Sequence, residues 1–171
     1  MQCECCDRNM VEILKSREYL FYRCKFCGFW TTRQHSGQYP VYDYIDAGTY
    51  DYNADTSFHS LAEEARCIMI NKLEAAGRQE GGVFLDVGCS EGVYVYAMQS
   101  LGWEAYGFEI DAAKVERARA KQLSVMHPSD SPFMGPGGVD FILIRHTIEH
   151  IPDFMTVLRT AAQLLAEEGV L

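Results

Sequence analysis

The segment from Val83 to Gly92, VFLDVGCSEG, is the sequence feature that most constrains the fold. An apolar run with β-branched residues ends on two glycines, and a helix-compatible stretch follows from Val93 to Leu101. This order of strand, tight turn and helix is typical of the opening βαβ unit of a nucleotide-binding sheet. Gly88 would allow the sharp turn, and Gly92 would let the helix pack closely against the strand. The segment therefore predicts a parallel α/β fold with a ligand site at the turn.

Three polar side chains indicate which nucleotide this turn would bind. Ser90 stands where a dinucleotide-binding motif keeps a glycine for the close approach of a pyrophosphate. Asp86 places a carboxylate beside the turn, which would repel a diphosphate and attract a cation. Glu109 follows a second short strand, Glu104 to Phe108, where it can accept hydrogen bonds from both ribose hydroxyls. S-adenosylmethionine fits all three features, because it has a ribose, no phosphate, a cationic amine and a sulfonium.

The turn resembles motif I of the class I S-adenosylmethionine-dependent methyltransferases, with Glu109 in the place of their acidic ribose-binding residue. The resemblance implies a Rossmann-like, doubly wound and mainly parallel sheet, with S-adenosylhomocysteine as the product of the reaction. We expect the side chain of Cys89 to fill space in this turn rather than act as a nucleophile. The cofactor-binding residues expected from the resemblance are Asp86, Gly88, Cys89, Ser90, Gly92, Glu109, Ile110, Asp130, Arg145 and His146.

Composition limits the function classes open to the chain. Its 171 residues allow one ordinary domain plus a small appendage, and the net charge of −9 disfavours broad nucleic-acid binding. No apolar run approaches the length of a membrane span, and the N-terminus lacks the layout of a signal peptide. Seven cysteines, four of them in CxxC pairs, favour metal binding in a reducing cytoplasm over a disulfide framework. We therefore predict a cytoplasmic protein with no membrane contact.

Two CxxC pairs predict a zinc ribbon at the N-terminus. Each pair can present two thiolates from one tight turn, and two such turns complete a tetrahedral zinc site. Val11 to Leu14 and Glu18 to Arg23 would form two short strands between the pairs. Cys5 could replace a ligand of the first pair, although spacing favours its neighbours. The predicted ligands are Cys3, Cys6, Cys24 and Cys27.

The role of the ribbon is less constrained than its fold. It carries more basic than acidic side chains, which would suit nucleic acid, but four zinc-bound thiolates offset much of that charge. A structural or substrate-lid role is therefore favoured. The tyrosine-rich segment 37–56 that follows is expected to link the ribbon to the main domain, with some of its tyrosines lining an acceptor pocket.

A helix is predicted from Thr56 or Ser57, the candidate N-cap, to about Ala76, where Gly77 would end it. Its apolar stripe is expected to be ordinary core, and Cys67 on the same helix is expected to be buried. The stripe consists of Leu61, Ala65, Ile68, Met69 and Leu73.

The second half of the chain continues the α/β pattern. Asp111 can cap a helix from Ala112 to Gln122, and Leu123 to Met126 would form the third strand. In the methyltransferase family an acidic residue after this strand often meets the adenine amino group, and Asp130 is the nearby candidate. The proline- and glycine-rich loop from 133 to 138 leaves no room for the helix that usually precedes the fourth strand.

Val139 to Ile144 is predicted to be the fourth strand, apolar enough for the middle of a parallel sheet. It would deliver the stretch RHTIEH to the sheet edge where ligands bind. This stretch resembles the motif that faces the acceptor in small-molecule methyltransferases. His150 or His146 could take a proton from the acceptor, and Glu149 could orient that imidazole. Alternatively, Glu149 and His150 only cap the next helix and pack beneath the cofactor.

The same stretch matches the inverted zincin pattern H-x-x-E-H, which needs both histidines on one face of a continuous helix. A buried strand runs directly into His146, and Pro152 follows the motif at once. A helical zinc site is therefore not expected.

A last helix is expected from Phe154 to Ala166, capped by Asp153, with Val170 and Leu171 as the first step of a fifth strand. Complete members of the family continue with further strands, so the sequence looks truncated. The fourth strand would then be an exposed apolar edge through which the chain could self-associate, and the chain itself could be inactive.

Together these features predict a zinc ribbon in residues 1–36, an aromatic linker or lid in 37–56, and an S-adenosylmethionine-binding domain in 57–171. The domain would contain an incomplete, mainly parallel α/β sheet of four to five strands. The predicted function is methyl transfer to O, N or C of a small molecule, such as a sugar or natural-product intermediate. Two alternatives remain: an RNA methyltransferase whose ribbon grips RNA, and a non-catalytic module that senses S-adenosylmethionine or scaffolds a partner.

Overall fold

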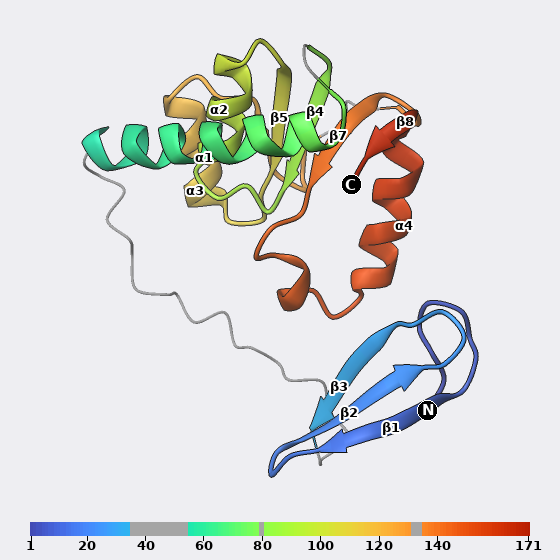
Figure 1. Cartoon of the computed structure of the whole chain (residues 1–171). Helices are drawn as coiled ribbons and strands as arrows, with labels where there is room; N and C mark the ends of the chain where they lie inside the picture. The colour runs from blue at the N-terminus through green and yellow to red at the C-terminus, as the bar shows by residue number, and fades with distance from the viewer. Residues whose placement is uncertain (35–54, 79–80, 131–134) are drawn as a thin grey trace.

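The structure, a computed structural model, describes residues 1–34, 55–78, 81–130 and 135–171. Nearly all of the predicted aromatic linker, 37–56, lies outside these residues, so its expected role in an acceptor pocket stays a prediction. Figure 1 shows the two parts on either side of it, a small β-sheet at the N-terminus and a layered α/β domain.

The N-terminal part is a three-stranded antiparallel sheet in the order β1-β2-β3. Its strands are β1 (Met10–Lys15), β2 (Tyr19–Cys24) and β3 (Trp30–Gln34). The two predicted strands are confirmed, whereas the third strand was not predicted from the sequence. It forms because Phe29 O accepts a hydrogen bond from Cys24 N at 2.8 Å, which folds the chain back onto β2.

The main domain contains a five-stranded sheet in the order β6-β5-β4-β7-β8, and each neighbouring pair is parallel. The strands are β4 (Val83–Val87), β5 (Glu104–Phe108), β6 (Val125–Met126), β7 (Val139–Leu143) and β8 (Leu165–Val170). The chain starts in the middle of the sheet, moves to one edge, and then returns to build the other edge. This reversal confirms the predicted doubly wound fold, and it places a crevice beside β4 where ligands bind in such sheets.

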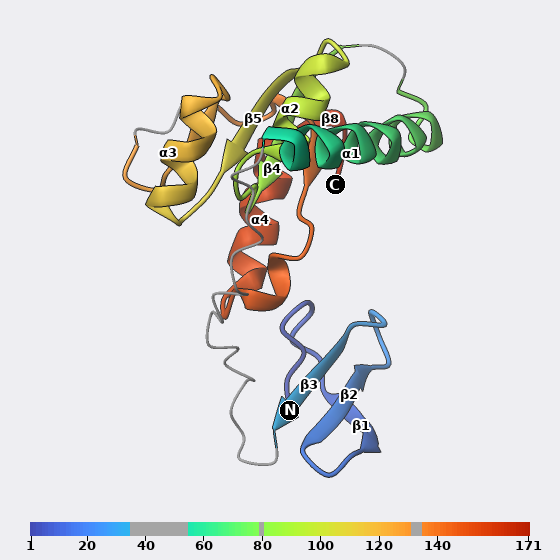
Figure 2. The same ribbon diagram turned by 90° about the vertical axis from the view of Figure 1, so that its left-hand side faces the viewer.

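Helices cover both faces of this sheet (Figures 1 and 2). One face packs against α1 (Asp55–Ala75), α2 (Val93–Ser100) and α3 (Ala112–Ala120), and the other packs against α4 (Phe154–Leu164). Side chains alternate along each strand, so Phe84 faces the three helices and Leu85 faces α4. Asp86 therefore points to the same side as Phe84, toward α1 and α2.

Side-chain caps fix where two of the helices begin. Asp111 accepts hydrogen bonds from Ala113 N at 2.9 Å and Lys114 N at 3.3 Å, and Asp153 accepts one from Thr156 N at 3.2 Å. Both caps confirm predictions made from the sequence. The start of α1 is different, because the helix already includes Asp55, two residues before Ser57, the candidate cap.

The end of the chain corrects two further predictions. Helix α4 ends at Leu164 rather than Ala166, and β8 begins at once with Leu165. The strand pairs with β7 at Val139–Leu165 and Phe141–Val170, so β7 is a central strand and not the exposed edge that was expected. Gly169 makes this approach possible, since an added Cβ would lie 2.9 Å from Val139 O.

Two other features of the described residues bear on the predictions. Cys67 is exposed on α1, so its predicted burial was wrong. Within the described ranges, none of the helices combines the length and the apolar character needed to cross a membrane.

Candidate cofactor site and metal centre

A cavity of about 400 Å³ lies at the carboxyl end of β4, between the following turn and α1. This volume falls in the usual range for small-molecule sites. Six of the predicted cofactor residues line it, namely Asp86, Gly88, Cys89, Ser90, Arg145 and His146. The other lining residues are Leu61, Glu64, Ala65, Ile68, Glu91, Val93 and Tyr94.

Helix α1 supplies a wall of this cavity that the sequence did not predict. Leu61, Ala65 and Ile68 belong to the stripe that was interpreted as ordinary core, yet all three line the cavity. Met69 and Leu73 of the same stripe are buried in the core, as expected. Periodicity could not separate the two groups, because core and cavity lie along one continuous face of the helix.

Left-handed backbone conformations shape the turn between β4 and α2. Gly88 has φ +80°, Ser90 has φ +52°, and Gly92 has φ +85°. A Cβ on Gly88 would lie 2.2 Å from Thr147 Oγ1, and one on Gly92 would lie 2.7 Å from Leu123 Cδ1. Gly88 is therefore required for the turn, as predicted, and also for packing. Gly92 is required for packing, but against Leu123 and the start of β6 rather than against β4 as expected.

Glu109 holds the turn to the end of β5. Its carboxylate accepts hydrogen bonds from Ser90 N and Asp111 N, both at 2.9 Å, and its side chain is buried. A carboxylate has about four acceptor positions, so these two contacts leave room for ribose hydroxyls. The structure thus brings Glu109 and Ser90 together, whereas the ribose contact itself stays a prediction.

Asp86 is a buried carboxyl group with an unusual protonation equilibrium. Burial and the nearby charge of Glu109 raise the pKa of Asp86 to about 7, and Arg145 partly opposes this shift. A cationic ligand in the cavity would favour the ionised form. The group is therefore poised to change protonation state when such a ligand binds.

Glu91 is a cavity residue that the sequence analysis missed. Its buried carboxylate forms ion pairs with Arg117 Nε at 2.6 Å and Lys121 Nζ at 3.1 Å. These two ion pairs connect the turn after β4 to α3 and its C-cap residue. The signal that could have found it is the placement of Arg117 and Lys121 one turn apart on the predicted helix. Two basic side chains on one face suggest an acidic partner.

The residues after β7 form the rim of the cavity. Arg145 donates to the Tyr94 hydroxyl, and its guanidinium lies 5.5 Å from the centre of the Tyr94 ring. His146 has φ +53°, which is strained for a residue other than glycine. Its Nδ1 lies 3.8 Å from Glu149 Oε1.

The predicted catalytic residues share this rim only in part. Glu149 and His150 belong to a short 3-10 helix, Ile148–His150, and both are exposed. Among the described residues that line the cavity, His146 is the one member of the predicted catalytic trio. The catalytic roles of all three stay predictions, and the alternative in which Glu149 caps α4 is not favoured, because Asp153 is the cap.

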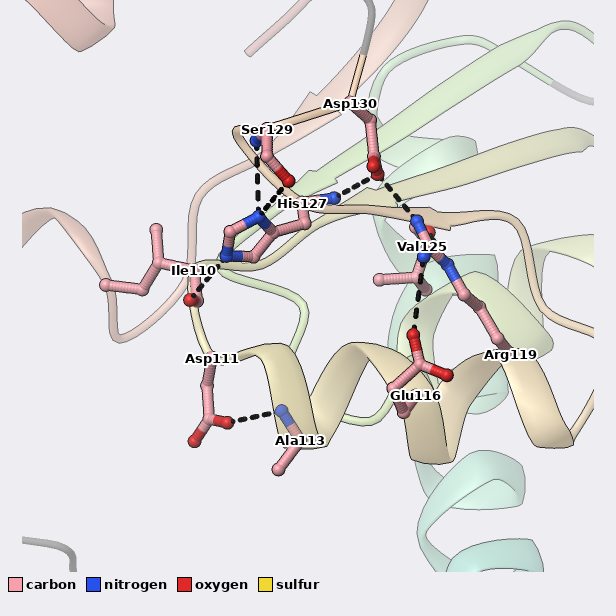
Figure 3. A network of polar contacts seen from close by, with 9 residues as sticks. All are labelled: Ile110, Asp111, Ala113, Glu116, Arg119, Val125, His127, Ser129 and Asp130. Carbon is pink, nitrogen blue, oxygen red and sulfur yellow. Dashed lines mark hydrogen bonds and ion pairs between the residues drawn. The ribbon is translucent and has the colours of Figure 1, made fainter.

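Asp130, the predicted adenine contact, belongs to a network at the ends of β5 and β6 (Figure 3). Asp130 Oδ2 accepts hydrogen bonds from Arg119 Nη2 at 2.6 Å and from His127 N at 2.7 Å. These contacts, above all the backbone amide of His127, lower the pKa of Asp130. Ile110, another predicted cofactor-binding residue, is 69 % exposed and therefore open to a ligand.

Cys89 fills space beside the cavity, as predicted. It is 4 % exposed, and burial raises the pKa of its thiol, which disfavours the thiolate that a nucleophile needs. A Cβ on Gly107 would lie only 2.4 Å from Cys89 Sγ.

We therefore expect Gly107→Ala to lower the free energy of unfolding by about 1–3 kcal/mol, the usual cost of overpacking a core. Urea unfolding would measure the loss, and adding Cys89→Ala should recover part of it. Gly135→Ala is the matched control, since an added Cβ there meets nothing within 4 Å. Equal stability of the Gly107 and Gly135 variants would contradict the prediction.

Four cysteine side chains come together in the ribbon. The Sγ atoms of Cys3, Cys6, Cys24 and Cys27 all lie within 4.8 Å of one another, and two of the distances are 3.6 Å (Cys3–Cys27) and 3.5 Å (Cys6–Cys24). Sulfurs that sit about 2.3 Å from one tetrahedral zinc are separated by about 3.8 Å, so the group fits this metal. Hydrogen bonds from the backbone, led by that of Cys27, lower the pKa of Cys24, whereas the pKa of its partner Cys6 is raised within the same cluster.

Cys5 is exposed and lies outside this cluster, so it does not take the place of Cys3 or Cys6 in the group of four sulfurs.

The ribbon also contacts the main domain. The Phe29 ring stacks on the Phe154 ring at the start of α4, with 5.9 Å between ring centres.

The fold and this set of side chains define a class I S-adenosylmethionine-dependent methyltransferase domain with an appended cysteine cluster suited to zinc. Residues 61–171 match a protein family described as a methyltransferase domain, and the chain belongs to that family.

Relatives agree with this assignment. The ubiquinone biosynthesis O-methyltransferase of Xanthomonas campestris is 30 % identical over 99 residues, a match that covers 53 % of this chain and 41 % of the relative. The corresponding protein of Xanthomonas euvesicatoria is 30 % identical over 108 residues, which covers 58 % of this chain and 44 % of that protein. The chain therefore spans less than two thirds of the curated relatives it matches.

Solved structures show the same fold. A protein of Methanococcus maripaludis assigned to the S-adenosylmethionine-dependent methyltransferases superposes with a TM-score of 0.56 at 16 % identity, over 69 % of this chain and 58 % of that one. The PH0226 protein of Pyrococcus horikoshii gives a TM-score of 0.54 at 19 % identity, over 70 % and 57 % of the two chains.

Proposed function

We propose that this protein transfers a methyl group from S-adenosylmethionine to O, N or C of a small-molecule acceptor. The observation that carries the proposal is the cavity beside the β4 turn, where the buried carboxyl group of Asp86 lies next to a turn that has no pyrophosphate-binding glycine. A ligand with a ribose and cationic groups suits this chemistry better than a dinucleotide does. The O-methyltransferase names of the relatives add support for a small acceptor.

Each part of the cofactor would have its own partner in this arrangement. Glu109 would bind the ribose hydroxyls, and Ile110 would contact one face of the adenine. Asp86 and the backbone of Ser90 would face the amino acid end, where the carboxylate of Asp86 attracts positive charge. The bound cofactor supplies an activated methyl group on a sulfonium.

The rim after β7 would face the acceptor. His146 lines the cavity, and its Nδ1 side is held near Glu149, so this imidazole can accept a proton from an acceptor hydroxyl or amine. His150 and Arg145 would position the acceptor beside it. Holding acceptor and methyl in line accounts for much of the rate in reactions of this kind.

The ribbon would have a structural role with bound zinc. Its stacking contact through Phe154, just after the proposed acceptor motif, supports a role in holding that side of the site. The second candidate, an RNA acceptor, is favoured by two exposed aromatic rings on the ribbon that lie under arginines, Phe26 with Arg8 and Trp30 with Arg23. Such pairs can stack nucleic-acid bases.

Calorimetric titration of the zinc-loaded protein with S-adenosylhomocysteine tests the cofactor proposal. We expect micromolar binding by the native chain and a loss of at least about ten-fold in Glu109→Ala, because the ribose contacts disappear. Glu104→Ala is the matched control, since Glu104 lies at the opposite end of the same strand. Absence of binding by a folded native chain would contradict the proposal, and tight binding of a single-stranded RNA oligonucleotide would favour the second candidate.

A further inference from the structure

The imidazole of His127 connects the ends of two neighbouring strands (Figure 3). Its Nε2 lies 3.1 Å from Ile110 O, just beyond β5. Its Nδ1 lies 3.2 Å from Ser129 N and 2.8 Å from Ser129 Oγ, in the loop after β6. No motif in the sequence assigns this histidine a role.

The partners of the ring define which nitrogen donates and which accepts. Ile110 O is a carbonyl oxygen, so Nε2 must carry a proton and donate it. Ser129 N–H is a donor, so Nδ1 must be an unprotonated acceptor. The three contacts are therefore satisfied together when Nε2 donates and Nδ1 accepts.

Ile110 stands between two residues that the site uses. Glu109 before it binds the turn through Ser90 N, and Asp111 after it caps α3. The Ile110 side chain is 69 % exposed at the place proposed for the adenine. Ile110 O and Asp111 N belong to one peptide group, and Asp111 N donates to Glu109 Oε1 at 2.9 Å. A rotation of this peptide group would therefore shift the Glu109 carboxylate.

We propose that His127 is a positioning residue that orients the Ile110 peptide, and through it the adenine and ribose end of the cofactor site, by donating its Nε2 proton to Ile110 O. The inference rests on the proposed cofactor function. Arg119 supports the same loop from α3 by donating to Val125 O at 3.0 Å and to Asp130. The bond from His127 to Ile110 is the link that can be altered without touching the residues that would contact the cofactor.

Two conservative variants separate the two sides of the ring. In His127→Gln the amide NH₂ lies near the position of Nε2 and can still donate to Ile110 O. In His127→Asn the amide oxygen lies near the position of Nδ1, so it can accept from Ser129 N but the side chain is too short to reach Ile110. We therefore expect His127→Gln to bind S-adenosylhomocysteine within about three-fold of the native chain, and His127→Asn to bind about ten-fold more weakly.

Calorimetric titration with S-adenosylhomocysteine and with methylthioadenosine would measure this difference, because both ligands carry the adenine and ribose. The loss in His127→Asn should be the same for both ligands. Thermal unfolding of the two variants without ligand should agree closely, which would show that loop stability alone does not account for the effect.

Three results would overturn the inference. His127→Asn could bind as tightly as the native chain, which would show that the contact with Ile110 is not needed. His127→Asn could bind more tightly than His127→Gln, which would assign the role to the Ser129 turn. A loss confined to S-adenosylhomocysteine would place the effect at the amino acid end. If the native chain binds neither ligand, the proposed function itself fails and this inference fails with it.

Discussion

The variant Cys24→Ser is expected to unfold residues 1–34 and to lose bound zinc. Cys24 is buried, its Sγ lies 3.5 Å from Cys6 Sγ, and it belongs to the four-sulfur cluster. The buried hydrophobic cluster of the ribbon is small, with only Cys3, Met10 and Cys24 in its centre. A three-stranded sheet of this size cannot fold on such a core, so the metal must supply the missing free energy.

The expected magnitude is large, because structural zinc contributes about 10–16 kcal/mol to small domains of this kind. Mass spectrometry under native conditions would count zinc per chain, and limited proteolysis would report whether residues 1–34 become accessible. The domain from 55 onward should stay folded, since its core contains no ribbon residue.

Cys5→Ser and Cys67→Ser are the matched controls, because both cysteines are exposed and lie outside the cluster. Each should retain one zinc per chain. A Cys24→Ser protein that keeps its zinc and resists proteolysis would show that the ribbon does not depend on this ligand.

The second large effect is expected at Asp86, where Asp86→Asn should stabilise the ligand-free protein at pH 8 while weakening S-adenosylhomocysteine binding. The pKa of this carboxyl group rises from 3.8 to about 7 in the folded state, with burial as the main cause. The folded state therefore keeps a proton that the unfolded state releases between these two values. Consequently the free energy of unfolding falls as pH rises from about 4 to 7, and the full cost is present above pH 7.

A difference of about three pKa units corresponds to roughly 4 kcal/mol, which is the largest stabilisation that Asp86→Asn could give at pH 8. Urea unfolding at pH 5 and pH 8 would measure it. The native chain should lose stability between these two values, and most of that loss should disappear in the variant. Glu116→Gln is the matched control, because Glu116 is an exposed carboxylate. Asp140→Asn would not serve, since Asp140 also accepts a hydrogen bond from Val83 N.

Asp86→Asn should weaken the binding of S-adenosylhomocysteine although it stabilises the ligand-free protein. If Asp86 faces the cationic end of the cofactor as proposed, its ionised form would attract that end and the neutral amide would not. We therefore expect Asp86→Asn to bind S-adenosylhomocysteine at least about ten-fold more weakly than the native chain at pH 8. A variant that is both less stable and equally tight in binding would contradict this account of Asp86.

Much of the fold could be predicted because its signals are local. Cysteine spacing predicted the metal ligands, the apolar run before Gly88 predicted β4, and Asp111 and Asp153 predicted two helix caps. Each of these depends on residues that are close in sequence, where turn chemistry and capping decide the outcome.

The errors and omissions involve contacts between distant segments. The helix boundary at Leu164 was missed because β8 is stabilised by pairing with β7, which competes with helical propensity at 165 and 166. Glu91 was missed because its partners lie 26 and 30 residues away, one on α3 and one at the C-cap of that helix. Cys67 was misplaced because an apolar residue type does not reveal which side of a helix meets solvent.

The sequence by itself determined the class of the protein: the β4 turn with Asp86 and Glu109 predicted a methyltransferase domain, and two CxxC pairs predicted the cysteine cluster. These motifs carry their chemistry in a few neighbouring residues and in fixed spacings. Only the tertiary structure decided that α1 lines the cavity, that Asp86 is buried beside Glu109, and that His127 contacts Ile110. Burial and contact depend on how distant elements pack, and that packing sets both the protonation of Asp86 and the orientation of His127.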